Sequence, residues 1–123
     1  MGRSNLLGSW GEALAAEFLK GKHYKIVAVH YYSRFGEIDI IAQNREYLVF
    51  AEVKLRKTDF FGEAREFVGA QKQKRLLAAA TIWLQQNPTK LQPRFDVIEI
   101  YAPEGTASEH PEIVHLEDAF QTL

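Results

Sequence analysis

Two stretches, GEIDIIAQ at residues 36–43 and EYLVFAEVKL at residues 46–55, decide the fold predicted for this chain. Both are rich in β-branched or aromatic residues and are separated by a polar break, which is typical of two antiparallel strands joined by a hairpin. Because side chains alternate along a strand, Glu37 and Asp39 share one face of the first strand, as do Glu52 and Lys54 of the second. These charges interrupt otherwise apolar strands, so they need a compensating interaction.

The pairing of the two strands depends on where the hairpin turn is centred. A turn over residues 43–46, centred between Asn44 and Arg45, places Asp39 opposite Phe50. Glu52 then lies one diagonal step away on the same face. A turn shifted by one residue places Asp39 directly across from Glu52. In either register the two carboxylates lie within reach of one cation, with backbone positions about 5–8 Å apart.

Two interpretations of this acidic hairpin remain open. Burial of an ion costs several kcal/mol unless it is compensated, and Mg²⁺ would compensate it with one or two carboxylates, waters and phosphate oxygens as ligands. The chain has no cysteine, which favours Mg²⁺ or Mn²⁺ over zinc, and Lys54 would add a positive charge beside the reaction centre. Alternatively, the hairpin is an exposed edge with ordinary salt bridges, which explains Glu52 with Lys54 better than it explains Asp39.

Helices and further strands are predicted on both sides of this hairpin. They are a helix over 5–20 with Ser4 as its N-cap and Gly21 as its stop, strands over 25–32 and 94–101, an irregular connection over 62–69, a helix over 70–86, a loop over 103–111 and a short edge strand over 112–116. The order α-β-β-β-α-β predicts one α/β or α+β domain over residues 1–123, with helices flanking a mixed sheet. Residues from about 103 to 123 form an acidic tail.

The first predicted helix is apolar on two sides. One side carries large residues, and the other carries mostly small ones together with Glu12. The large residues are Leu7, Trp10, Leu14 and Phe18, and the small-residue side comprises Gly8, Glu12, Ala15, Ala16 and Leu19. Such a helix is expected to be buried between other elements, where an unpaired Glu12 carboxylate would be costly.

Composition and charge restrict the class of protein. With 46% hydrophobic and 12% aromatic residues, a chain of 123 residues can form one ordinary core. Its apolar runs fall far short of the roughly 20 residues that span a bilayer, and no signal peptide is recognisable, so we expect a cytoplasmic protein without a membrane partner. Residues 1–95 hold all 15 Lys and Arg against 9 Asp and Glu, whereas residues 96–123 hold 7 acidic residues and no basic ones. This asymmetry permits a nucleic-acid surface and equally fits two solvated faces.

Basic side chains cluster in two places. Lys72 belongs to the run at residues 71–75 near the start of the second predicted helix, where a helix N-terminus favours anions; a plain exposed helical turn explains the run equally well. Arg56 and Lys57 directly follow the acidic strand and could hold a neighbouring phosphate. The predicted nucleic-acid-binding residues are Arg56, Lys57, Lys72, Lys74 and Arg75.

The remaining polar candidates are interpreted as structural. Asp96 is predicted to be either a salt-bridge partner of Arg94 or a brace at the edge of the core. Glu37 either supports the acidic site or braces the hairpin. The four histidines show no ligand-like spacing and are interpreted as incidental; they are His23, His30, His110 and His115.

Asp39, followed by Glu52-Val53-Lys54 in the next strand, resembles the D…(D/E)-x-K signature of the restriction-endonuclease superfamily. The fuller string resembles the YraN family of small bacterial proteins, which are similar to archaeal Holliday junction resolvases. The resemblance covers about the first hundred residues. It is carried by Gly11, Glu12, Ala15, Leu19, residues 36–39 and 50–54, Arg56, Gly62, Lys72, and residues 83–84 and 94–97.

The resemblance implies a restriction-endonuclease-like core and a metal-dependent endonuclease acting on DNA, branched or junction DNA included. It implies Asp39, Glu52 and the Val53 carbonyl as ligands of Mg²⁺ or Mn²⁺ and Lys54 as the catalytic lysine. Glu12 would complete the catalytic acidic site and is a further candidate ligand. The resemblance also implies a homodimer that aligns two sites. A non-catalytic nucleic-acid-binding module of the same fold, or a small interaction protein with an acidic hairpin, are the alternatives.

Overall fold

The computed structural model describes residues 6–57 and 69–120. The elements are α1 (Leu6–Gly21), β1 (Lys25–Ser33), β2 (Gly36–Gln43), β3 (Tyr47–Arg56), α2 (Ala70–Gln86), β4 (Gln92–Tyr101), the short 3₁₀ helix η3 (Gly105–Ala107) and β5 (Glu112–Leu116). The predicted α+β class, the element order and the edge strand are confirmed. The predicted N-cap Ser4 and residues 62–68 of the predicted connection lie outside the described residues.

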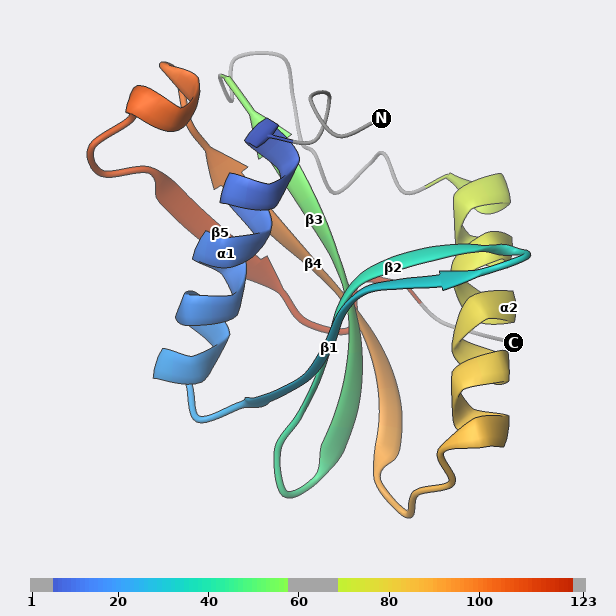
Figure 1. The fold of residues 1–123 in the computed structure, drawn as a ribbon. Coiled ribbons are helices and arrows are strands. Elements are labelled where there is room, and N and C mark those ends of the chain that lie inside the picture. Colours follow the sequence, from blue (N-terminus) through green and yellow to red (C-terminus); the bar gives the residue numbers. More distant parts are fainter. Residues whose placement is uncertain (1–5, 58–68, 121–123) are drawn as a thin grey trace.

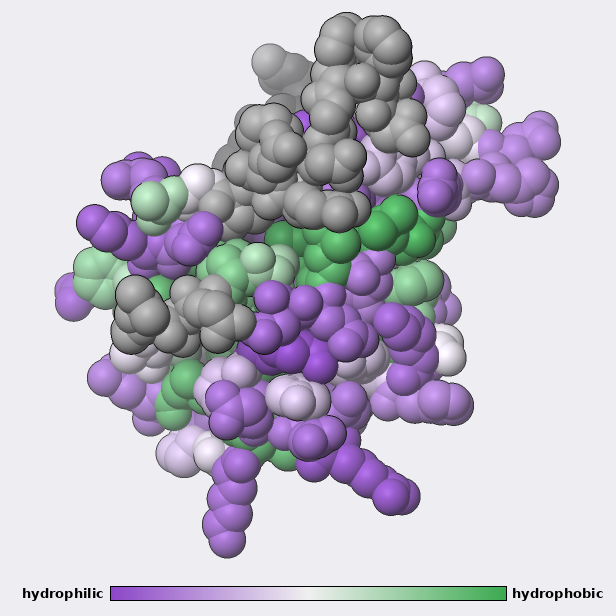
Figure 2. All heavy atoms as spheres, turned by 180° about the vertical axis from the view of Figure 1, so that it is seen from behind, coloured by the Kyte–Doolittle hydropathy of each residue, from purple (hydrophilic) through white to green (hydrophobic). Residues whose placement is uncertain are grey.

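One mixed sheet separates the two helices (Figure 1). Its strand order is β1-β2-β3-β4-β5, and every neighbouring pair is antiparallel except β3 and β4, which α2 joins as a crossover. β4 is central to the core: Val97 faces α2, while Ile98 and Ile100 face α1, and all three are fully buried. From behind, a narrow hydrophobic band crosses a mostly hydrophilic surface (Figure 2). Within the described residues, neither long helix is long and apolar enough to cross a membrane.

Helix α1 packs on the sheet through its small residues. Ala15 and Leu19 are fully buried, and Gly11 lies so close to β3 that an added Cβ would approach a Leu55 methyl group to 3.0 Å. The large residues Trp10, Leu14 and Phe18 are partly buried against the same cluster. Both predicted apolar sides therefore contact one face of the sheet, except that Leu7 of the large side is exposed. The small side is innermost because it permits the closest approach.

The β1–β2 hairpin changes faces at its middle. Ile40 packs on the α1 side of the sheet and Ile38 on the α2 side, although residues two apart in a regular strand share a face. The residue between them is Asp39, whose position in the register is opposite His30. His30 has a left-handed backbone with φ of 51°, and this conformation twists the hairpin, so that its tip reaches α2 (Figure 1).

The β2–β3 turn resolves the register. The Asn44 side-chain oxygen accepts hydrogen bonds from the N–H groups of Glu46 at 2.9 Å and Tyr47 at 2.8 Å, so the turn lies one residue later than residues 43–46. The ladder pairs residue 43 with 48 and ends with Ile40 opposite Ala51. Continued by one residue, this register brings Asp39 opposite Glu52. Pairing of Asp39 with Phe50 is wrong, and the shifted alternative is confirmed.

The end of α1 also differs from expectation. The helix continues through Gly21 and stops at His23, whose φ is 72°. The N–H of His23 donates to the Lys20 carbonyl and that of Tyr24 to the Leu19 carbonyl, both at 3.0 Å, which is the Schellman pattern with a left-handed residue at its turn. Gly21 is therefore not the stop, because the left-handed position falls two residues later.

Replacing the exposed His23 with glycine should raise the free energy of unfolding by about 0.5–1 kcal/mol, because glycine adopts the left-handed conformation without steric cost. The matched change His23→Val should lower it, since a β-branched residue is strained at positive φ. Urea denaturation of the three proteins measures both effects. A glycine variant less stable than the parent would show that this helix end is not held in the left-handed conformation.

Candidate active site

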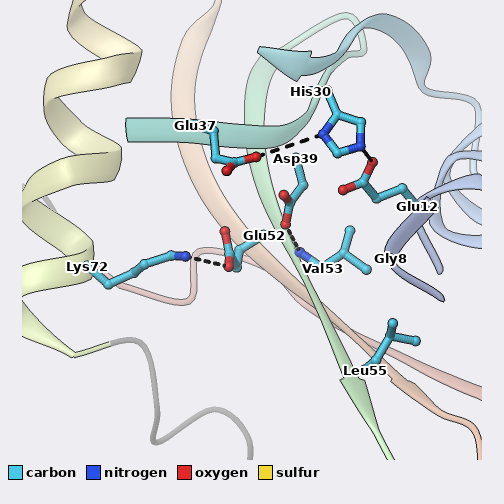
Figure 3. A pocket seen from close by; sticks show the side chains of 9 residues that line it. All are labelled: Gly8, Glu12, His30, Glu37, Asp39, Glu52, Val53, Leu55 and Lys72. Atoms are coloured by element: carbon cyan, nitrogen blue, oxygen red, sulfur yellow. Dashed lines mark hydrogen bonds and ion pairs between the residues drawn. The ribbon is translucent and has the colours of Figure 1, made fainter. Parts of the chain in front are cut away.

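A fork opens where β2 separates from β3. Beyond the last ladder pair, the Val53 N–H donates to Asp39 Oδ2 at 2.8 Å, so a side chain takes the place of the next backbone partner. A cavity of about 260 Å³ lies in this fork. Its lining comes from α1, β1, β2, β3 and α2, as Figure 3 shows: Gly8, Glu12, His30, Glu37, Asp39, Glu52, Val53, Leu55 and Lys72.

The three carboxylates predicted for the site line this one cavity. Glu12 enters from α1, while Asp39 and Glu52 come from neighbouring strands (Figure 3). Lys54 does not line the cavity; its Nζ lies 4.0 Å from Glu52 Oε2, at the margin. Lys72 of α2 lies closer, with its Nζ 3.0 Å from the same oxygen. The alternation of β3 puts Lys54 on the same side as Glu52, as predicted, but α2 brings a second lysine closer to that carboxylate.

Crowding of the carboxylates disturbs their protonation. Burial raises the pKa of Asp39 to about 6, although the Val53 N–H opposes the shift, and the charge of Glu12 adds to it. Burial also raises the pKa of Glu52, and Asp39 contributes further. Glu12 has a raised pKa for the same reason, burial, although the charge of His30 opposes the shift. Near neutral pH the cavity therefore holds more negative charge than its surroundings favour.

Lys72 supplies the positive charge that the structure places against Glu52. Burial tends to lower its pKa, but the hydrogen bond and charge of Glu52 outweigh burial and raise it. Lys72 stands in the first turn of α2, whose N-cap is Gly69. Lys72 is thus the counter-ion of Glu52. The sequence predicted for Lys72 either a phosphate contact or a plain exposed helical turn, and neither includes this ion pair.

The interpretation of the histidines as incidental is wrong for two of them. His30 Nε2 pairs directly with the Glu12 carboxylate, and its Nδ1 lies 3.8 Å from Glu37. His115 bonds Asp96 at 2.7 Å and Lys22 at 2.8 Å. Neither histidine has a sequence spacing that reveals it, because both partners come from other elements. Only the register, with His30 opposite Asp39, could have indicated the first.

Asp96 is structural, as predicted. Its carboxylate accepts hydrogen bonds from the Arg94 Nε at 2.9 Å and from the Asp118 backbone N–H at 2.9 Å, besides the bond to His115. Burial would raise the pKa of Asp96, but these partners outweigh it and lower the pKa. The fully buried carboxylate fastens β5 and the residues after it to β4.

Glu37 combines both of its predicted alternatives. It pairs with Tyr32 in the β1–β2 ladder and also lines the acidic cavity. Among the predicted phosphate contacts, Lys57, Lys74 and Arg75 are exposed and Arg56 is partly buried. Arg56 ends β3 and Lys57 directly follows it, whereas Lys72, Lys74 and Arg75 lie on α2.

The donor set fits a divalent cation bound mainly by two carboxylates. No three His, Asp or Glu side chains among residues 6–57 and 69–120 form a metal-binding group by themselves. Mg²⁺ needs only one or two carboxylates when waters and phosphate oxygens complete its shell, and Asp39 and Glu52 meet that smaller requirement. The N–H and C=O of one strand residue point to the same side, so the Val53 carbonyl points to the side of its N–H bond to Asp39.

Comparison with known proteins identifies relatives but no activity. The model of "Uncharacterised protein family UPF0102" matches residues 11–100, which include all four predicted catalytic residues. A UPF0102 protein of Geotalea daltonii is 45% identical over 117 residues, covering 93% of this chain and 88% of that protein. One from Acetivibrio thermocellus is 41% identical over 116 residues, covering 92% and 89%. One from Syntrophomonas wolfei is 36% identical over 115 residues, covering 93% and 96%.

Replacing Asp39 with asparagine should stabilise the metal-free protein at pH 7.5. A carboxyl whose pKa is raised to about 6 stabilises the fold fully only below its unfolded pKa near 4, and that stabilisation is lost as pH rises through 6. Asparagine keeps an oxygen for the Val53 N–H and removes the charge. We expect a gain of about 1–3 kcal/mol at pH 7.5 that shrinks toward zero between pH 6 and pH 4.

Thermal melts in EDTA across this pH range measure the effect. Glu46→Gln is the matched control, because Glu46 is an exposed carboxylate in the β2–β3 turn, and it should melt like the parent. An Asp39→Asn protein that melts well below the parent at pH 7.5 would instead make Asp39 a member of a stabilising ion pair.

Proposed function

This chain belongs to the uncharacterised protein family UPF0102, and we propose that it hydrolyses phosphodiester bonds of DNA in a reaction that requires Mg²⁺ or Mn²⁺. One observation carries the proposal: Asp39 and Glu52, from adjacent strands, line a single cavity with raised pKa values. Two carboxylates that lie in one cavity and repel each other are stabilised when a hard divalent cation binds between them.

The proposal assigns a role to each residue of the fork. Asp39 and Glu52, with the Val53 carbonyl, would hold the cation, which when bound lowers the pKa of a water and neutralises phosphate charge. The Val53 N–H orients the Asp39 carboxylate, and Glu12 lies in the same cavity, where its charge contributes to the raised pKa of Asp39. Lys72, the counter-ion of Glu52 in the cation-free protein, and Lys54 at the margin supply positive charge for a phosphate.

Hydrolysis explains the acidic cavity better than binding alone. Carboxylates repel phosphate, so a protein that only binds nucleic acid gains nothing from placing three of them beside basic side chains. One observation favours the binding-only alternative: Asp39 and Glu52 already have partners in Val53 and Lys72. Under that alternative the protein does not cleave DNA, and replacing Asp39 or Glu52 would not alter its response to Mg²⁺.

DNA binding should depend on phosphate contacts from the basic residues beside the fork. Affinity for DNA in EDTA should therefore fall steeply between 50 and 200 mM salt, by counterion release. Lys74→Ala, at an exposed position of α2, should lower the salt dependence by about one released ion without changing the fold. Fluorescence anisotropy at several salt concentrations measures this slope, and an affinity independent of salt would refute the assigned surface.

Cleavage assays test the proposal directly. Linear, flapped and four-way DNA are incubated with the protein and Mg²⁺ or Mn²⁺, and parallel samples contain EDTA. We expect cleavage of at least one substrate only with the cation, and a fall of about a hundredfold or more for Asp39→Asn and for Glu52→Gln. Glu46→Gln should cleave like the parent. Metal-independent cleavage, or equal activity of Asp39→Asn and the parent, would disprove the proposed site.

A further inference from the structure

The tip of the β1–β2 hairpin presents aromatic rings to solvent. Tyr32 is 66% exposed and Phe35 is 45% exposed, although large apolar side chains are usually more covered. The Tyr32 ring lies parallel to the His30 ring, with centroids 6.0 Å apart and an angle of 9° between planes. The Arg34 guanidinium lies 5.0 Å from the centre of the Phe35 ring. The hairpin tip thus exposes two rings, one beside a guanidinium and the other, Tyr32, beside His30 of the candidate active site.

A second cavity, of about 280 Å³, lies between Tyr32 of this hairpin and the side chains of α2. Tyr32 lines it from the hairpin, and Lys72 and Arg75 line it from the helix. It shares Glu37 and Lys72 with the acidic cavity, so the two cavities adjoin. Figure 3 shows these two shared residues at the edge of the acidic cavity.

The hairpin tip is held in place rather than left free. Gly36, with φ of 155°, lies so close to α2 that an added Cβ would approach the Arg75 Cβ to 3.3 Å. The Ser33 hydroxyl donates to the Gly36 carbonyl at 2.9 Å and accepts from the Phe35 N–H at 3.1 Å. These contacts hold the hairpin tip against α2, as a preformed binding site requires.

We propose that Tyr32 and the second cavity bind an unpaired nucleobase of the strand that enters the acidic cavity. Aromatic rings interleaved with basic side chains are the means by which proteins hold single-stranded nucleic acid, because every base has a face that can stack. Lys72 and Arg75 would neutralise the adjacent phosphates, and the Glu37 carboxylate can accept a hydrogen bond from a base amino group.

This site would select the structure of the substrate. In a duplex each base is paired and stacked between neighbours, so a base reaches a protein ring only after unstacking. A ring beside the acidic cavity therefore favours DNA with an unpaired nucleotide next to the cleaved bond. The inference rests on the proposed nuclease function and deepens it by naming the substrate class as single-stranded or locally unpaired DNA.

A protein partner is the alternative ligand for the surface that these rings form. Exposed apolar side chains also mark protein interfaces, and the neighbouring Val29 of β1 is 51% exposed. The charges favour the strand: Lys72 and Arg75 line the second cavity with Tyr32, and Arg34 lies against the Phe35 ring. Glu37 is the one carboxylate among the described residues lining that cavity. This balance complements an anionic strand.

Binding in EDTA tests the inference without any need for cleavage. The affinities of fluorescein-labelled single-stranded oligothymidine and of a blunt duplex are measured by anisotropy for the parent, Tyr32→Ser and Tyr32→Phe. Tyr32→Ser should weaken single-strand binding about five- to hundredfold and change duplex binding less than twofold. Tyr32→Phe keeps the ring and should bind like the parent. Leu77→Ser, at an exposed apolar position of α2, is the control and should bind both as the parent does.

Each result has one meaning. If the parent binds both DNAs and Tyr32→Ser binds the single strand equally well, the inference is wrong and the proposed function stands. Equal losses on both DNAs also reject it, because the ring would then not distinguish an unpaired base. If the parent binds neither DNA, the proposed function fails and the inference with it. Light scattering that shows a change of oligomeric state in Tyr32→Ser would assign the rings to a protein interface.

Discussion

The hydrogen bond from the Val53 N–H to Asp39 Oδ2 is the contact on which the candidate site depends. It occupies the point where the β2–β3 ladder ends, and a backbone donor there would otherwise lose its partner at a cost comparable to a hydrogen bond. The aspartate side chain satisfies the donor while the β2 backbone turns away toward α2. The same hydrogen bond therefore both accompanies the separation of the two strands and positions the Asp39 carboxylate.

The separation lets elements from both faces of the sheet meet. Glu12 reaches the fork from α1, because the small residues of that helix allow close packing on β3. Lys72 reaches it from α2, which follows β3 in the chain and covers the other face. His30, in its left-handed conformation, bends the hairpin and also pairs with Glu12. A regular sheet would keep these groups apart, since its backbone separates the side chains on one face from those on the other.

The candidate site lowers the free energy of unfolding of the protein near neutral pH. Burial and mutual repulsion raise the pKa of Asp39, Glu52 and Glu12, and Lys72 offsets only part of the repulsion. The two apolar clusters on either side of the sheet stabilise the chain against this cost. A cluster of acids that weakens its own protein is more typical of a functional site than of a structural ion-pair network such as Arg94 with Asp96.

The sequence by itself determined what depends on neighbours along the chain. Hydrophobic periodicity placed α2 and β5 at the residues where the structure has them, and alternation put Asp39, Glu52 and Lys54 in their strands. The tertiary structure decided what depends on contacts between elements. Asn44 shifted the turn by one residue and selected the register. Helix α2 brought Lys72 closer to Glu52 than Lys54 is, and α1 brought Glu12 to His30. Periodicity records which face of an element is buried, but not which side chain of another element it meets there, because that distance is set by packing across the core.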